Sequence, residues 1–195
     1  MKNKLLFISV FFLFYTSVFS QAIDEFRVFY GTADSRFLDN PQLIGGGIND
    51  VKNFNKIGFK LLKYLDRYEK IGLDVGLTFS RADVLITSNF SGSPVNKRKE
   101  SFEMLSIPLN LNITILRHIF ANAGPVFDFQ TSNNSFVSQS GVGYMLGVGG
   151  KYYFNNVLVF LNPNFQRHTV TPFNTKSDPK KLTEFGFIIG VGLYL

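Results

Sequence analysis

Apolar and polar residues alternate along most of this chain with a period of two. The clearest run covers residues 71–80, where bulky apolar side chains hold the odd positions and small or polar ones the even positions. The same alternation recurs, with varying regularity, over residues 25–31, 56–65, 105–115, 120–131, 141–154, 157–168 and 185–195. A period of two is typical of strands with two different faces. The pattern therefore predicts an all-β fold of eight strands.

The connections between these strands alternate in length. Short links at 66–69, 116–118 and 155–156 take every second place, and the last of these is Asn155-Asn156, a dipeptide suited to a hairpin. Longer polar links lie between them, at about 32–55, 88–101, 132–140 and 171–182. Short turns on one side and long loops on the other are typical of an antiparallel up-and-down transmembrane β-barrel with its turns in the periplasm.

The glycines indicate which strand face lies inside the barrel. Nine of them share a face with polar residues such as Asp74 and Lys151; these are Gly72, Gly76, Gly124, Gly143, Gly147, Gly149, Gly186, Gly190 and Gly192. An eight-stranded barrel is just wide enough for its interior to be filled by side chains, so we expect the small, polar face to line the lumen. The bulky face then contacts lipid. The alternative is a secreted, lipocalin-like barrel with the faces reversed.

Aromatic residues near the strand ends are candidates for the girdles of a membrane barrel, the alternative being general aromatic enrichment in strands. They are Tyr64, Phe79, Phe129, Tyr144, Tyr152 and Phe154.

Residues 1–20 have the three-part layout of a secretory signal peptide. Lys2 and Lys4 precede an uncharged run from Leu5 to Phe19, and the segment closes at Ser20. The run is too short for a comfortable helical span of the hydrocarbon core, so we expect cleavage. The predicted domains are a signal peptide at 1–20 and a barrel at 21–195.

The composition excludes several kinds of functional site. The 195 residues include no cysteine and only two histidines, His118 and His168. Disulfides and sulfur-ligated metal sites are thereby excluded, and we expect no metal site, cofactor or catalytic residue. The mean hydropathy of +0.09 averages two opposed strand faces. The formal net charge is +6, but a secretory signal disfavours nucleic acid as a partner.

Charged residues on the predicted inner face form a candidate lumen network. Its members are Arg27, Lys60, Asp74, Asp128 and Lys151. Buried charges need partners, and the short turn at 66–69 should bring Lys60 close to Asp74. We interpret the network as a salt-bridged plug, with a proton or ion path as the alternative.

Basic residues in two predicted outer loops form a candidate patch for the phosphates of lipopolysaccharide, although loop lysines are commonly only solvated. The patch consists of Lys97, Arg98, Lys99, Lys176, Lys180 and Lys181.

One enzymatic reading starts from His168. This histidine lies near Thr169 and Thr171, with Glu184 as the nearest candidate acid. A lipid A-modifying acyl hydrolase needs a base and a hydroxyl nucleophile within hydrogen-bond reach. The pattern His-Thr-Val-Thr offers no serine at the expected spacing, so this hypothesis ranks second.

Three segments carry a resemblance to a known family. Ile107–Leu111, Ala121–Phe127 and Gly143–Tyr153 are similar to the porin-family outer membrane β-barrel domain of Bacteroidetes, sometimes called PorT-like. The last strand also resembles the signal read by the barrel assembly machinery, although it ends on Leu195 instead of an aromatic residue. The resemblance implies an outer membrane location in a Gram-negative cell and no catalytic residue.

These observations favour a non-enzymatic integral outer membrane barrel with a structural, adhesion or small-solute role. We expect a monomer whose partners are membrane lipids, lipopolysaccharide and, during insertion, the barrel assembly machinery. A narrow conduit or secretion-system accessory is a third hypothesis.

Overall fold

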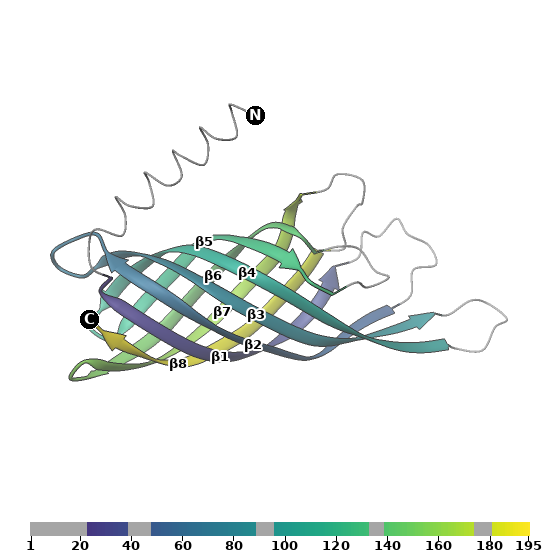
Figure 1. Ribbon diagram of the computed structural model, residues 1–195, viewed down its shortest axis with the longest axis horizontal. Coiled ribbons are helices and arrows are strands. Elements are labelled where there is room, and N and C mark those ends of the chain that lie inside the picture. Colours follow the sequence, from purple (N-terminus) through teal and green to yellow (C-terminus); the bar gives the residue numbers. More distant parts are fainter. Residues whose placement is uncertain (1–22, 39–47, 89–95, 133–138, 174–180) are drawn as a thin grey trace, which may run out of the picture.

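The computed structural model describes residues 23–38, 48–88, 96–132, 139–173 and 181–195, and these form one closed barrel of eight antiparallel strands (Figure 1). The strands are β1 (Glu25–Leu38), β2 (Ile48–Tyr64), β3 (Ile71–Ser88), β4 (Asn96–Leu116), β5 (Ile119–Gln130), β6 (Gly141–Phe154), β7 (Val157–Pro172) and β8 (Lys181–Tyr194).

Each strand pairs with its neighbours in the sequence, and β1 closes the barrel against β8. The closing register runs from Glu25 opposite Tyr194 to Leu38 opposite Lys181. Within the described residues, no helix is long and apolar enough to cross a membrane. The predicted eight-stranded, up-and-down topology is confirmed, whereas residues 1–20, the predicted signal peptide, lie outside the described part of the chain.

Several strands are longer than the sequence pattern predicts. β1 and β2 extend into the expected connection at 32–55, while β3 and β4 occupy much of the one expected at 88–101. Figure 1 shows β3 and β4 reaching furthest from the end where the C terminus lies. The predicted long loops were therefore partly wrong, and Lys97, Arg98 and Lys99 lie on β4.

In the part of the barrel nearer the short turns, the outer face is apolar and the inner face is largely polar. Outward side chains such as Leu73, Leu111 and Phe187 are exposed, whereas Asp74 and Asn112, which alternate with them, are buried. A soluble barrel keeps its apolar face inside, so the structure excludes the lipocalin-like arrangement. The inward position of the glycine-rich face is confirmed.

This arrangement inverts at one level on three neighbouring strands. Phe79 on β3 is exposed and lies opposite Ile57 of β2 and Leu105 of β4. Two residues further along β3, outward Arg81 lies opposite Asn55 and Glu103.

Beyond that level the outer face is polar and the inside is apolar. The buried cluster there consists of Val51, Phe54, Ala82, Val84, Phe102, Met104 and Leu182. The inversion explains why the connections at 32–55 and 88–101 were overestimated: the same strands continue, but their apolar side chains change face.

Candidate functional sites in the barrel interior and on its wall

A first charged cluster lies at the turn end of the interior, around Glu25. This carboxylate is fully buried and pairs with Arg27 at 2.5 Å. The hydroxyls of Tyr64 and Tyr153 donate to it at 2.5 and 2.6 Å. The Lys151 ammonium lies 3.9 Å away and donates to the Tyr64 hydroxyl at 2.7 Å. Charge pairing and hydrogen bonds together compensate the loss of water around these groups.

Aromatic rings cover the cations of this cluster. The Arg27 guanidinium lies over Phe120 and Phe160, at 5.5 and 5.4 Å from the ring centroids. Both rings belong to a second buried apolar cluster, together with Phe29, Leu158 and Ile188. Cation–π attraction is strongest for such desolvated cations. The turn end of the lumen is therefore filled by side chains.

Polar residues also fill the middle of the lumen. The Asn110 amide donates to Asp74 at 2.8 Å. Lys60 lies opposite Gly76 in the β2–β3 register and Leu62 lies opposite Asp74, so Lys60 and Asp74 are two positions apart on neighbouring strands. The Lys60 ammonium lies 5.8 Å from the centroid of the Phe29 ring. Four more buried asparagines continue this band around the wall, namely Asn112, Asn122, Asn162 and Asn164.

A second charged cluster closes the loop side of this band. Lys56 pairs with Glu184, whose other oxygen lies 3.6 Å from His168 Nε2. His168 Nδ1 lies 2.8 Å from Asp128, which also accepts from the Ser106 hydroxyl at 2.6 Å. An imidazole whose two nitrogens face carboxylates donates to both only when it is doubly protonated.

The arrangement around His168 does not match a hydrolase. The Thr169 hydroxyl donates to the backbone of Gln139, and the Ser106 hydroxyl donates to the acid instead of the imidazole. Thr171 lies on the exposed surface, and His168 itself is 1% exposed. Glu184 is near His168 as predicted, but in the described residues no hydroxyl forms a hydrogen bond with the imidazole.

The structure places all five predicted lumen residues in the interior, where they divide among three clusters. Sequence reasoning missed Glu25, Lys56 and Glu184 as lumen charges. Their spacing from residues already assigned to the inner face could have identified two of them. Glu25 lies two residues from Arg27, and Glu184 lies two residues from Gly186, so each pair points to the same side of its strand. Among the described residues, no group of three or more His, Asp or Glu side chains is arranged to hold a metal ion.

The predicted basic patch lies partly on the upper extension of β4. Arg98 pairs with Glu100, and Lys99 lies 3.2 Å from Asp83; both basic side chains are 65% exposed. Lys181 begins β8 and is half-buried. Lys176 and Lys180 lie outside the described residues.

Four of the six candidate girdle residues are exposed on the outer wall. Phe79 and Phe129 are exposed near the loop side of the apolar belt, and Tyr152 and Phe154 are exposed at its turn side. Tyr144 is half-buried and packs on Phe165 at 6.2 Å between ring centroids. Tyr64 was assigned wrongly: its side chain points inward, because the hydroxyl bonds to Glu25.

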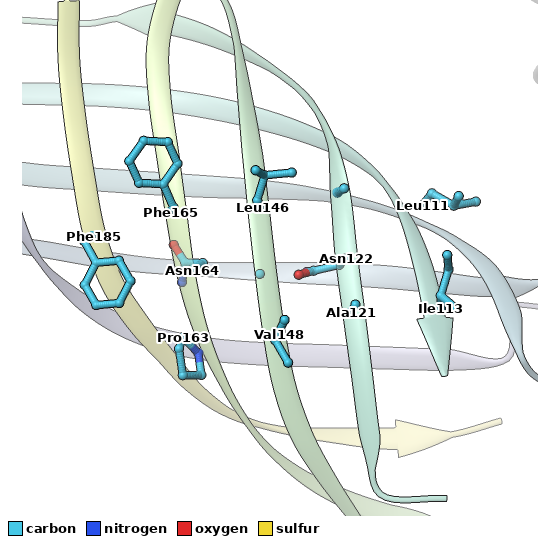
Figure 2. A pocket seen from close by; sticks show the side chains of 12 residues that line it. Leu111, Ile113, Ala121, Asn122, Leu146, Val148, Pro163, Asn164, Phe165 and Phe185 are labelled. Atoms are coloured by element: carbon cyan, nitrogen blue, oxygen red, sulfur yellow. The ribbon is translucent and has the colours of Figure 1, made fainter. Parts of the chain in front are cut away.

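A shallow apolar groove of about 490 Å³ lies on the wall across β4 to β8. Figure 2 shows Ala121 of β5 between Ile113 on one side and Val148 on the other. The small Ala121 and Ala123 side chains create the depression between taller neighbours. Its lining is almost entirely apolar, in keeping with the rest of the outer belt.

These features define a closed eight-stranded barrel with a filled polar interior and an apolar outer belt. A scan of protein-family models finds no match to the chain, and a search among curated proteins finds none either.

Among solved structures, the chain is similar to Ail, the attachment invasion locus protein of Yersinia pestis. The crystal structure of Ail with the heparin analogue sucrose octasulfate aligns at 14% identity and a TM-score of 0.45, covering 89% of this chain and all of Ail. The Ail structure in a phospholipid bilayer nanodisc aligns at 12% identity and a TM-score of 0.44, covering 90% of this chain and all of Ail.

Proposed function

We propose that the protein is an integral outer membrane β-barrel with a plugged lumen and a structural or adhesion role at its outer end. The proposal rests on the change of the outer face of β3 from apolar at Phe79 to charged at Arg81. Below that level, outward apolar residues continue to Ile71, which matches the roughly 9–11 residues that a tilted membrane strand needs. Lipid is the solvent that makes such an outer face favourable, and barrel closure satisfies its backbone hydrogen bonds.

The interior supports a role without conduction or catalysis. Two ion-pair clusters and two apolar clusters fill the lumen, and His168 faces carboxylates on both sides. A small-solute or conduit role would require these clusters to separate. Recognition would then fall to the polar extensions of β2, β3 and β4 at the opposite end from the turn at 66–69.

Membership of the porin-family barrel domain, a monomeric state and insertion by the barrel assembly machinery remain predictions from the sequence. Lipopolysaccharide is the proposed partner of the exposed basic side chains Arg98 and Lys99, because phosphate groups pair well with them. An Arg98→Ala, Lys99→Ala variant should retain less lipopolysaccharide on native gels. Retention equal to that of the unchanged protein would contradict this assignment.

Cell fractionation tests the proposed location. In a Gram-negative host the protein should sediment with outer membranes, resist extraction by urea, and run on gels at different positions before and after heating. Recovery of folded protein from the periplasm without detergent would overturn the proposal.

A further inference from the structure

Small residues gather at outward positions on one side of the barrel wall. Ala121 and Ala123 lie on the outer face of β5, Gly150 on that of β6 and Pro163 on that of β7. Across the barrel, β3 carries only Ile, Leu, Val and Phe at its outward positions from 71 to 79. Because short side chains leave the surface low between taller neighbours, the wall over β5, β6 and β7 is hollowed.

Two grooves form over these residues and meet end to end. The groove of about 490 Å³ includes Val148 of β6 and Pro163 of β7. A second groove, of about 410 Å³, includes the next outward position of each strand, Gly150 and Leu161. The nearest atom to a Cβ at Gly150 would be the His118 carbonyl oxygen, at 3.7 Å, so the space over this glycine is open. Together the two form one wall groove, which runs along β6 from Leu146 to Tyr152.

The length of the wall groove matches one leaflet of a bilayer. Figure 2 shows Leu146 and Val148 in line along β6. From Leu146 to Tyr152 the strand advances about 20 Å, at about 3.3 Å per residue. Because strands of a membrane barrel tilt by about 40°, this advance corresponds to about 15 Å along the membrane normal. That height is half of the roughly 30 Å hydrocarbon core, so the wall groove has room for an extended acyl chain of one leaflet.

The turn end of the wall groove carries positive charge. Two turns flank it, and neither contains an acidic residue: one is Leu116-Arg117-His118 and the other is Asn155-Asn156. Arg117 and His118 are both exposed. A guanidinium pairs strongly with phosphate oxygens. An apolar groove that ends at an arginine is therefore complementary to a phosphate group attached to an acyl chain.

His118 and Tyr152 form the rim where the apolar groove ends. Their rings stack with 5.2 Å between centroids and 19° between planes. His118 Nδ1 lies 3.3 Å from the Lys151 carbonyl oxygen, so the imidazole is held by a second contact. Amphipathic aromatic rings are enriched at the level of lipid headgroups. The stacked pair therefore places the end of the wall groove at headgroup level, next to Arg117.

We propose that the wall groove binds one glycerophospholipid, with an acyl chain between Leu146 and Tyr152 and its phosphate at Arg117. A chain in the groove contacts wall atoms on its floor and on both sides, and it thereby gains dispersion contacts that a chain on a convex wall lacks. The source of the lipid rests on the proposed function, in which the short turns lie in the periplasm. The leaflet on that side of an outer membrane consists of phospholipid, whereas lipopolysaccharide occupies the opposite leaflet.

Native mass spectrometry tests the site after the barrel has inserted into vesicles of palmitoyl-oleoyl phosphatidylglycerol and has been released in mild detergent. The unchanged barrel should retain one phosphatidylglycerol molecule. Arg117→Gln should lower the retained fraction about fivefold, the upper end for an exposed ion pair. Gly150→Leu, which fills the groove, should lower it by at least as much. Arg67→Gln, in the turn between β2 and β3 that also contains Asp66 and Glu69, is the matched control and should leave it unchanged.

Equal retention by all four proteins would overturn the proposal. Equal retention of a diacylglycerol with the same chains, which lacks the phosphate, would do so too, as would lipopolysaccharide that displaces the phospholipid. A dimer that is lost in Gly150→Leu would identify a second copy of the chain as the occupant instead. The heat-dependent gel shift is measured first. Failure of the unchanged barrel to insert contradicts the proposed function, whereas insertion without retained phospholipid contradicts only the site.

Discussion

Glu25 organises the turn end of the lumen as a single residue with several partners. One buried carboxylate accepts from Arg27, Tyr64 and Tyr153 and lies near Lys151. The two tyrosines bring β2 and β6 to this carboxylate of β1, and β8 lies beside it because Glu25 is opposite Tyr194. Loss of its charge would leave two buried cations without their counter-ion.

Glu25→Gln should therefore lower the free energy of unfolding by about 3–5 kcal/mol, the range for breaking a buried ion pair. Urea titration in lipid vesicles, read from the heat-modifiable gel band, measures this change. Asp34→Asn is the control: Asp34 and Arg36 lie 3.5 Å apart with side chains 72% and 82% exposed, so the change should be at most about 1 kcal/mol. Equal effects of the two substitutions would contradict the role of Glu25.

Two consecutive glycines test the packing of the wall from inside and outside. A Cβ at inward Gly149 would lie 2.5 Å from Phe120 Cζ and 2.6 Å from the Leu161 carbonyl, whereas at outward Gly150 the nearest atom is 3.7 Å away. Gly149→Ala should destabilise the barrel by about 1–3 kcal/mol through overpacking. Gly150→Ala should be neutral or slightly stabilising in the same urea titration. The reverse order would show that the faces are assigned wrongly.

Asp66 makes the stability of the turn between β2 and β3 depend on pH. Its carboxylate accepts from three backbone N–H groups, those of Tyr68, Lys70 and Ile71. These bonds, that of Ile71 first, hold the pKa of Asp66 below its usual range. The unfolded-state pKa is about 3.9, so the stabilisation is complete above that pH and disappears as pH falls through the lower folded-state value.

Amide hydrogen exchange at Lys70 and Ile71 measures this effect. Asp66→Ala should speed exchange of both amides at neutral pH, and the difference from the unchanged protein should shrink in acid, once Asp66 is protonated. A difference that is the same at every pH would rule out the charge of Asp66 as its cause.

At the scale of the element, the side chains on each face of a strand match the polarity of their surroundings. In the belt, apolar side chains face outward and Asn, Gly and charged side chains face inward, which the period of two predicts. The alternation continues in the upper parts of β2, β3 and β4, but the apolar positions shift to the inner face, as at Ala82 and Val84. A rule that keeps one face apolar therefore ends these three strands too early.

Lysine substitution on β8 tests the lipid-facing side of an element. Ile189 is 56% exposed near the middle of the apolar run from Phe185 to Leu193. Ile189→Lys should cost about 2–4 kcal/mol in a bilayer, because the ammonium then faces hydrocarbon. Thr171→Lys, at the exposed loop end of β7, should cost little in the same urea titration in vesicles. Comparable small costs at both positions would contradict a lipid-facing β8.

At the scale of the whole molecule, the closed topology was predictable because the strand periods and the short turns are local features. The contacts between side chains in the lumen were harder to predict from the sequence. Parity places Arg27 and Lys60 inside, but Tyr153 reaches Glu25 from 128 positions away only after β1 and β8 have closed the barrel. Which charges meet depends on register and tilt, and neither can be derived from alternation within one strand.

The central claim is that the barrel has lipid around its belt and water above Arg81. The chain has no cysteine, so single cysteines can be placed and spin-labelled one at a time. We predict that labels at Leu73, Val75 and Phe79 in vesicles collide with oxygen, whereas labels at Arg81 and Asp83 collide with a water-soluble nickel complex. Labels along residues 73–79 that are all accessible to nickel, or that show no change at Arg81, would contradict the account.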